Sequence, residues 1–352
     1  MVFIGSMKKY LKKLLSQPLS EHETAQVFSL LLEDTDNAAS DAQIGAYLLA
    51  TSLRGPSAAE LIAGVRSLRE HMVRVPLRMA LSKDAVLLDT AGTGGSGLDS
   101  FNTSTVAALV IAASGQTVTK HGNRAASSKC GSADLLEALG VTIELSPEQA
   151  SRCAVETGFC FMFAPLHHPA TKRVARVRRE LGFRTLFNFL GPLCNPAGAE
   201  CQLMGVSEKT MLPVISEALL ELGCQRAMIV RGEDGLDELS LSTDTEVFEV
   251  NQGFIRHYHI APEDFGLERV ALEQIKGYEP ARSAELALEV LRGKVSPYRD
   301  LIALNAGAGL YVANKVADIA EGVAKANEVL SSGKAAGLLE KVKEVSRRYG
   351  AN

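Results

Sequence analysis

The chain has 352 residues, of which 46% are hydrophobic, so it is long enough for one large domain or two smaller ones. Its formal net charge of -4 provides no basic field, which removes the simplest support for nucleic-acid binding. The six cysteines form no C-x-x-C pair and have no zinc-type spacing with histidine, so we expect buried thiols in a reducing cytosol.

The N-terminus does not resemble a secretory signal. Residues 1–6 are mildly apolar and precede Lys8 and Lys9, which reverses the order of charge and apolarity in such a signal. The apolar run at 106–113 is too short to span a bilayer. We therefore expect a soluble, cytoplasmic protein that does not contact a membrane and whose true start is Met1 or Met7.

Residues 7 to about 75 contain only helical patterns. Apolar side chains recur there at helical spacing, at Leu11, Leu14, Leu15, Val27, Leu30, Leu31, Leu48, Leu49 and Leu53. Turn signals at 18–20, 34–37 and 55–57 separate the helices. This pattern predicts a small all-helical domain over residues 7–80.

After residue 82, short apolar runs alternate with helical segments. The runs lie at 85–88, 117–119, 141–145, 159–163, 203–206 and 227–230, and the helices near 104–113, 133–139, 147–157 and 208–222. This alternation predicts an α/β domain with a mostly parallel sheet, over residues 81–171 and 201–352. The helix-like, proline-punctuated segment between them is expected to return in part, within 172–200, to the helical domain. Ligands of such sheets bind beyond the carboxyl ends of the strands.

A glycine-rich loop follows the first predicted strand. Its glycines are Gly92, Gly94, Gly95 and Gly97. They leave backbone N–H groups free to face an anion, and the loop continues through 102–105 into an apolar helix whose N-terminus favours phosphate. A tight turn with a capped helix is the alternative, but glycines this dense after a strand favour phosphate binding.

The same glycines fit the dinucleotide pattern G-x-G-x-x-G, which is weak evidence alone. A dinucleotide fold needs an acid at the end of the second strand, where this chain has Lys120 and His121. A cation there disfavours NAD, though not strictly NADP, and suits a second phosphate contact. The residues after it, 122–132, add two more cations, glycines and hydroxyl groups. A solvated loop could share this composition, but two neighbouring strands delivering such loops to one sheet edge favour a binding site.

Acidic residues follow the run at 227–230. Adjacent acids beyond a strand are more often surface residues than ligands, yet a site rich in phosphate oxygens needs counter-charge. Mg²⁺ commonly bridges one or two carboxylates and phosphate oxygens. Asp237 and Glu238 are the best candidates for that position.

A basic helix is predicted from His168 to Leu181. Its positions Lys172, Arg176 and Arg179 share one solvated face, opposite Val174, Val177 and Leu181. Arg178 lies at the edge of the apolar face. A half-buried arginine needs an anionic partner, which is either a structural carboxylate or the carboxylate of a substrate.

Taken together, these stretches resemble the anthranilate phosphoribosyltransferase family of tryptophan biosynthesis. The matching segments are 92–95, 102–105, 120–124, 131–140, 188–192 with 195–196, and 235–238, in the family's order and over nearly the whole chain. The resemblance implies a fold of the nucleoside phosphorylase and phosphoribosyltransferase type and a homodimer joined through the helical domain. It also implies transfer of 5-phosphoribosyl from phosphoribosyl pyrophosphate to the amine of anthranilate.

The resemblance assigns roles to individual residues. Phosphoribosyl pyrophosphate would contact Gly92, Gly95, Ser96, Ser100, Asn102, Thr103, Ser104, Thr105, Lys120, Ser127, Ser128 and Ser132. Two Mg²⁺ ions would be placed by Ser104, Asp237 and Glu238. Anthranilate would meet Gly92, Asn123, Arg178 and Pro192. Lys120 and His121 are the catalytic candidates: the first would offset charge on the departing pyrophosphate, and the second could take a proton.

One position departs from the family pattern, and three rival functions stay open. Ser96 stands where the family usually has Asp, so we expect altered metal or substrate affinity but retained activity; Asp99 could compensate. A transferase with another acceptor is the nearest rival. A pyrimidine nucleoside phosphorylase is disfavoured by the paired acids and by the cations at 120–124. A catalytically silent paralogue that binds phosphoribosyl ligands or nucleic acid is the third.

Overall fold

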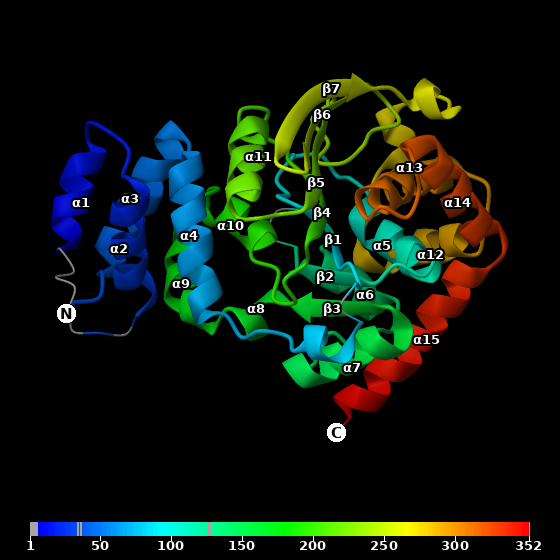
Figure 1. Ribbon diagram of the computed structural model, residues 1–352, viewed down its shortest axis with the longest axis horizontal. Helices are drawn as coiled ribbons and strands as arrows, with labels where there is room; N and C mark the ends of the chain where they lie inside the picture. The colour runs from blue at the N-terminus through cyan, green and yellow to red at the C-terminus, as the bar shows by residue number, and fades with distance from the viewer. Residues whose placement is uncertain (1–5, 34, 36, 83, 126–127, 352) are drawn as a thin grey trace.

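The computed structural model describes residues 6–33, 35, 37–82, 84–125 and 128–351. Ser127, a predicted phosphate ligand, lies outside these residues. Two bodies lie side by side: a helical bundle near the N-terminus and a larger α/β body that contains the C-terminus (Figure 1). None of the described helices combines the length and apolarity that crossing a bilayer requires.

The bundle begins with four helices, three of which start at a capping serine. They are α1 (Met7–Leu14), α2 (Glu21–Leu32), α3 (Asp41–Arg54) and α4 (Ala58–His71). A serine caps each of the last three, and a Glu or Gln three residues later bonds back to the serine N–H; the serines are Ser20, Ser40 and Ser57. The predicted all-helical N-terminal part is therefore confirmed.

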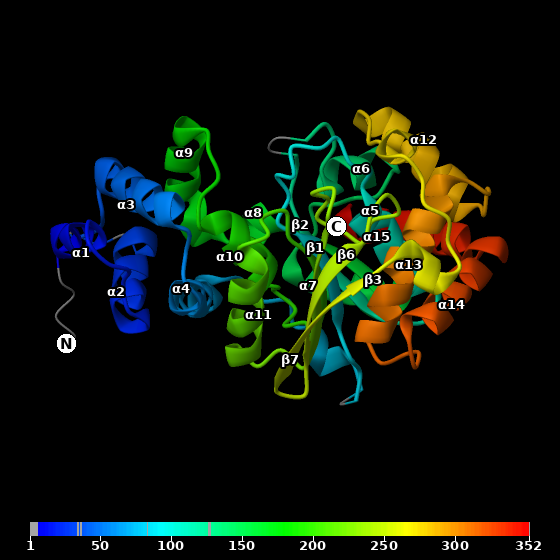
Figure 2. The same ribbon diagram turned by 90° about the horizontal axis from the view of Figure 1, so that it is seen from above.

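Two later helices pack onto this bundle. These are α9 (Lys172–Leu181) and α10 (Phe187–Leu193), which lie between α3 and the sheet (Figure 2). Val174, Val177 and Phe187 join Phe28 and Leu48 in one buried cluster. The helix predicted from His168 begins only at Lys172, because Pro169 opens a short 3-10 turn, Pro169–Thr171, ahead of it.

The α/β body is built on a seven-stranded sheet of order β3-β2-β1-β4-β5-β6-β7. The strands are β1 (Leu88–Gly92), β2 (Val118–Gly122), β3 (Phe159–Phe163), β4 (Cys201–Gly205), β5 (Arg226–Gly232), β6 (Thr245–Asn251) and β7 (Phe254–Ile260). The first five are parallel, while β6 and β7 are antiparallel to their neighbours, which confirms a mostly parallel sheet. The strand order reverses beside β1, and such a switch point opens a crevice for ligands.

Helices cover both faces of this sheet (Figure 1). One face packs on α5 (Thr103–Ala113), α12 (Pro280–Leu291), α13 (Pro297–Val312), α14 (Ile319–Ser331) and α15 (Lys334–Gly350), with α6 (Ser132–Ala138) beside them. The other meets α7 (Pro147–Thr157) and α11 (Met211–Glu221). The remaining helical turns are α8 (Ala164–His167) and the 3-10 segments Leu77–Ala80, Pro262–Phe265 and Leu272–Ile275. Neighbours along a strand divide between the two cores: Met228 faces α13 and Ile229 faces α11.

The strand predicted at 141–145 is wrong. Val141, Ile143 and Leu145 are buried in alternation with outward side chains, as in a strand, but the segment pairs with no strand in the part of the chain that the structure describes. Its Thr142 N–H donates instead to Ser346 Oγ of α15, at 3.1 Å. The buried side chains hold this segment in place as a connection between α6 and α7. The antiparallel pair β6 and β7 was not predicted.

Candidate active site

Three predicted loops meet at the carboxyl edge of the sheet. They follow β1, β2 and β5, and the last of them carries Asp237 and Glu238. The peptide of Asp237 lies directly on Gly205 at the end of β4, where a Cβ atom would overlap the Asp237 carbonyl oxygen. A Cβ atom on Gly92 would lie 2.7 Å from Asp237 Oδ2. Glycines at the ends of β1 and β4 therefore let the acidic loop approach the glycine loop.

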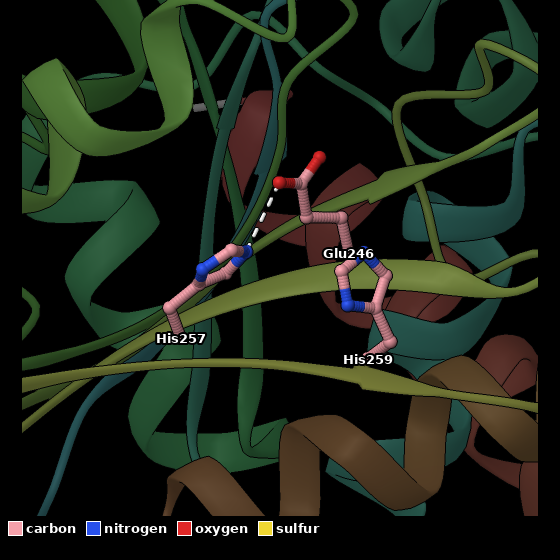
Figure 3. Close-up of side chains that lie close together, drawn as sticks. All are labelled: Glu246, His257 and His259. Carbon is pink, nitrogen blue, oxygen red and sulfur yellow. Dashed lines mark hydrogen bonds and ion pairs between the residues drawn. The ribbon is translucent and has the colours of Figure 1, made fainter.

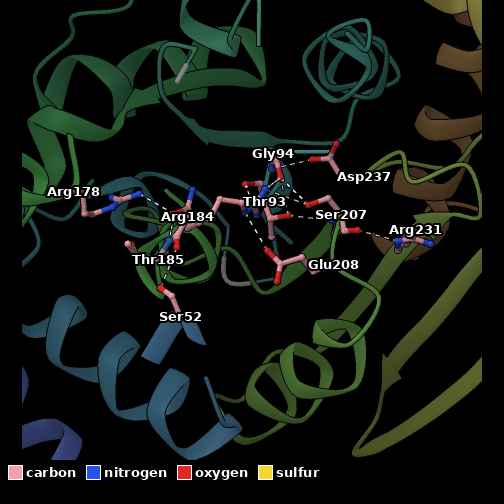
Figure 4. Close-up of polar contacts among 11 residues, drawn as sticks. Ser52, Thr93, Gly94, Arg178, Arg184, Thr185, Ser207, Glu208, Arg231 and Asp237 are labelled. Atoms are coloured by element: carbon pink, nitrogen blue, oxygen red, sulfur yellow. Dashed lines mark hydrogen bonds and ion pairs between the residues drawn. The ribbon is translucent and has the colours of Figure 1, made fainter. Parts of the chain in front are cut away.

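Side chains from three other segments hold the backbone of the glycine loop in place. Gly94 N–H donates to Asp237 Oδ2 at 2.9 Å, and the Gly94 carbonyl accepts from Ser207 Oγ at 2.9 Å and from Arg184 Nη1 (Figure 4). Gly95 has a φ of +74°, a conformation that favours glycine, and a Cβ atom there would overlap the Arg184 guanidinium. The conformation of the loop is thus fixed by residues that follow β4, β5 and α9.

Arg184 is a site residue that the sequence did not predict. Its Nη2 donates to Thr93 O at 3.4 Å, and its Nε lies 3.1 Å from Glu208. Ser52 of α3 donates to the Arg184 carbonyl at 3.0 Å, so this residue connects the bundle to the glycine loop (Figure 4). The sequence offers only an arginine after the α9 glycine cap, with no sign that it reaches a loop 90 positions earlier.

Lys120 lies beneath the glycine loop and is almost fully buried, at 1% exposed. Its ammonium group donates to the Thr90 carbonyl and to Ser104 Oγ, the latter at 3.1 Å. Burial lowers the pKa of Lys120 to about 8, while the charge of Asp89 acts in the opposite direction. A cation with so little solvent around it interacts strongly with any anion bound at the loop.

The N-terminus of α5 presents unsatisfied polar atoms. Asn102 Oδ1 and Thr105 Oγ1 are buried, and neither has a hydrogen-bond partner in the described part of the chain. The Asn102 amide nitrogen donates to Cys130 O at 2.9 Å, which links the first loop to the second. Because buried polar atoms are normally paired, these oxygens suit a polar ligand at the helix start.

Asp237 and Glu238 form a carboxylate pair with no ion-pair partner among the described residues. Glu238 is only 9% exposed, and burial raises its pKa well above the ordinary value. Burial also raises the pKa of Asp237, against the Gly94 N–H and the charge of Arg184. Two adjacent, poorly solvated carboxylates fit a divalent cation, which would offset their charge. Ser104 Oγ accepts from Lys120, so only part of its capacity is left for a metal.

One cavity of about 660 Å³ opens between the sheet edge and α9 and α10. Its lining contains every predicted anthranilate contact and one catalytic candidate, namely Gly92, Asn123, Arg178, Pro192 and His121. Arg178 donates to Asn188 Oδ1 at 3.1 Å and lies 5.7 Å from the centre of the Phe187 ring. Burial lowers its pKa. No acidic side chain pairs with Arg178 in the described residues, which leaves its charge for an anion in the cavity.

His121 is a poor candidate for a general base. Its Nδ1 lies 3.2 Å from Gly191 O, and its Nε2 is buried without a partner in the structure described. Burial, with smaller contributions from His168 and His167, lowers the pKa of His121 to about 3. The ring is therefore neutral near pH 7, and so low a pKa makes it a weak proton acceptor.

Comparison with known proteins places this arrangement in a family. Residues 8–72 match the helical bundle domain, and residues 84–336 the a/b domain, of a glycosyl transferase family. Anthranilate phosphoribosyltransferase from Persephonella marina is 46% identical over 343 residues, 97% of this chain and 99% of that protein. This chain belongs to the anthranilate phosphoribosyltransferase family.

Two solved structures of anthranilate phosphoribosyltransferases are similar throughout. The protein from Thermus thermophilus has a TM-score of 0.87 and 44% identity, with 97% of this chain and 100% of that chain covered. The protein from Saccharomyces cerevisiae, in complex with phosphoribosyl pyrophosphate and Mg, has a TM-score of 0.86 and 29% identity, covering 97% and 98%.

The remaining predicted phosphate ligands differ in their surroundings. Ser96 Oγ accepts from Leu98 N–H at 3.3 Å, so it caps its own turn. Asp99 pairs with Lys129 of the second loop at 2.6 Å and has no ion pair or hydrogen bond with Asp237 or Glu238 in the residues described. Four others lie on the same two loops or at the helix starts that follow them: Ser100, Thr103, Ser128 and Ser132. Asp99 thus connects the first loop to the second.

Proposed function

We propose that this protein transfers the 5-phosphoribosyl group from phosphoribosyl pyrophosphate to the amine of anthranilate, a step of tryptophan biosynthesis. The observation that carries the proposal is a single cavity with an acidic group near one end and an arginine at the other. At one end lies Gly92, so close to Asp237 that a Cβ atom on it would lie 2.7 Å from Asp237 Oδ2. At the other end Arg178 offers a positive charge without an acidic partner among the described residues. An aromatic acid held by Arg178 would present its amine toward the sugar at the glycine loop.

The proposed reaction is a substitution at ribose C1. The bond from C1 to the pyrophosphate oxygen breaks, the bond to the anthranilate nitrogen forms, and the sugar passes through an oxocarbenium-like state. Lys120, the glycine-loop amides and the start of α5 bind the phosphates and stabilise the charge that develops on the leaving group. Two Mg²⁺ ions, held by Asp237, Glu238 and Ser104, would supply further positive charge there.

The chain needs no strong base for this reaction, because an aromatic amine is already a neutral nucleophile. The neutral His121 lines the acceptor cavity with Asn123 and Pro192. The amine proton passes to water or to pyrophosphate. Holding both substrates in one orientation supplies much of the remaining acceleration. We assign contact with the activated sugar to the predicted set at 92–105, Lys120 and the second loop.

We also propose a cytoplasmic homodimer joined through the helical bundle. The bundle exposes the apolar side chains Leu15, at 87%, and Leu53, at 80%, as a docking face would. All six cysteines are free thiols, which suits a reducing compartment. Sedimentation of Leu53→Glu should show monomers where the unaltered chain sediments as a dimer; an unchanged mass would move the interface elsewhere.

A direct assay tests the activity. The purified chain is incubated with phosphoribosyl pyrophosphate, Mg²⁺ and anthranilate while anthranilate fluorescence is followed. We expect a loss of fluorescence that depends on all components. Turnover of another aromatic amine but not of anthranilate would support a different acceptor, and binding of phosphoribosyl pyrophosphate without turnover would support a silent paralogue.

Arg178→Ala is expected to raise the KM for anthranilate by roughly 10- to 100-fold, the size of one lost charged hydrogen bond. The KM for phosphoribosyl pyrophosphate should change little, because Arg178 lines only the acceptor cavity. Arg176→Ala, on the same helix but paired with Asp41 at the surface, is the matched control. Equal increases in both KM values for Arg178→Ala would contradict the assignment.

A further inference from the structure

A second cluster of metal-type ligands lies on the antiparallel edge of the sheet, among residues that the proposed reaction does not use. Glu246 of β6 is directly opposite His259 of β7, and His257 lies two residues earlier on the same face. Their ligand atoms all lie within 4.8 Å of one another (Figure 3). We propose that Glu246, His257 and His259 bind one divalent transition-metal ion of the Zn²⁺ class.

The donor set decides the class of ion. Two imidazole nitrogens and one carboxylate oxygen suit Zn²⁺, Co²⁺, Ni²⁺ or Cu²⁺, whereas Mg²⁺ prefers oxygen ligands and water. Three protein ligands leave a position for water or for a fourth donor. Glu233 could supply such a donor, since its Oε1 lies 4.0 Å from His259 Nε2. This site is therefore chemically distinct from the carboxylate pair at the glycine loop.

The ligands are partly fixed in place before an ion arrives. Glu246 is 6% exposed, so its carboxylate has little freedom, and its Oε1 lies 3.0 Å from His257 Nε2. The His257 ring stacks on Phe248, with centroids 4.3 Å apart and planes at 19°. The two imidazoles are roughly half exposed, at 49% and 44%, which gives an ion a path from solvent. A buried acid beside open imidazoles reduces the reorganisation that binding requires.

One cation competes for this position. Lys209 Nζ lies 3.2 Å from Glu246 Oε2, just before α11. A lysine there repels a divalent ion, but its side chain is 62% exposed and can turn into solvent. This contact gives the proposal a prediction of opposite sign: removing Lys209 should strengthen metal binding, while removing a ligand should weaken it.

The test measures Zn²⁺ and Co²⁺ binding to the chelator-stripped full chain by equilibrium dialysis, with excess Mg²⁺ to occupy the carboxylates near the glycine loop. We expect the unaltered chain to bind one ion that H257A/H259A does not bind. Glu246→Gln should weaken the binding of that ion by at least about 10-fold, because even changes to residues that only contact a metal ligand lower metal affinity by this much. Lys209→Ala should bind it more tightly.

The controls separate this site from general effects. His22→Ala, on α2 far along the chain, should leave the stoichiometry unchanged. All variants should retain Mg²⁺-dependent transfer and the unaltered circular dichroism spectrum, because none lies in the proposed reaction site. Equal stoichiometry in the unaltered chain and H257A/H259A, or no ion bound by the unaltered chain, would overturn the proposal. If the unaltered chain shows no transfer activity, the proposed function fails, but the metal-binding measurement still tests this site.

Discussion

The double substitution D237N/E238Q is expected to abolish stimulation of the transfer by Mg²⁺ and to lower kcat by at least about 100-fold, the scale of losing one preorganised electrostatic contact. Amides keep the shape of the two side chains but cannot offset a divalent ion. The measurement is initial rate against Mg²⁺ concentration. Asp244→Asn, an exposed acid paired with Arg269, is the control and should keep the metal dependence.

The same variant is also expected to change the thermal stability of the chain. Burial raises the pKa of Asp237 and of Glu238, so the folded chain binds their protons more tightly than the unfolded chain does. Ionising such groups costs stability as the pH rises above their unfolded values. Without Mg²⁺ at neutral pH, D237N/E238Q should therefore melt at an equal or higher temperature. A lower Tm would contradict this stability argument, and unchanged Mg²⁺ dependence would place the metal elsewhere.

Lys120→Met is expected to reduce kcat by about 100- to 1000-fold, since it removes the buried positive charge that the proposed mechanism sets against the leaving pyrophosphate. The pH dependence follows from the burial that lowers the pKa of Lys120 to about 8. Below that pH the side chain is charged, and above it the charge is lost. The kcat/KM for phosphoribosyl pyrophosphate should thus fall as the pH rises through about 8 in the unaltered chain.

The control for that step is the variant itself. Lys120→Met has no ammonium group to titrate, so its lower kcat/KM should not show the fall near pH 8. A rise in KM alone, with kcat preserved, would mean that Lys120 binds the ground state and the transition state equally. A persistent step at the same pH in Lys120→Met would assign the titration to another group.

Much of the fold was predictable because local patterns agreed with the global arrangement. Apolar side chains at helical spacing and turn signals marked the bundle helices, and apolar runs followed by glycine or acidic loops overlapped β1, β2 and β5. The segment at 141–145 misled, since alternating burial is shared by strands and by anchored connections; its backbone partner is Ser346, two hundred residues later. The strands β6 and β7 carry mixed polar residues with no continuous apolar run.

The candidate site was predictable where chemistry is local and not where it depends on distant packing. Arg178 could be singled out from its place at the edge of an apolar helix face, but its neighbour Asn188 could not. Arg184 gave no such signal, because its role arises only when the segment after α9 folds back onto Gly94. Its contact with Ser52 likewise joins elements far apart in the sequence.

A crystal structure of the chain with phosphoribosyl pyrophosphate, Mg²⁺ and anthranilate is the most direct test of the whole account. We predict pyrophosphate against the amides of the loop at 92–97, metal at Asp237 and Glu238, and the anthranilate carboxylate at Arg178. Electron density for the activated sugar away from that loop, or for anthranilate outside the cavity lined by Arg178, would contradict it.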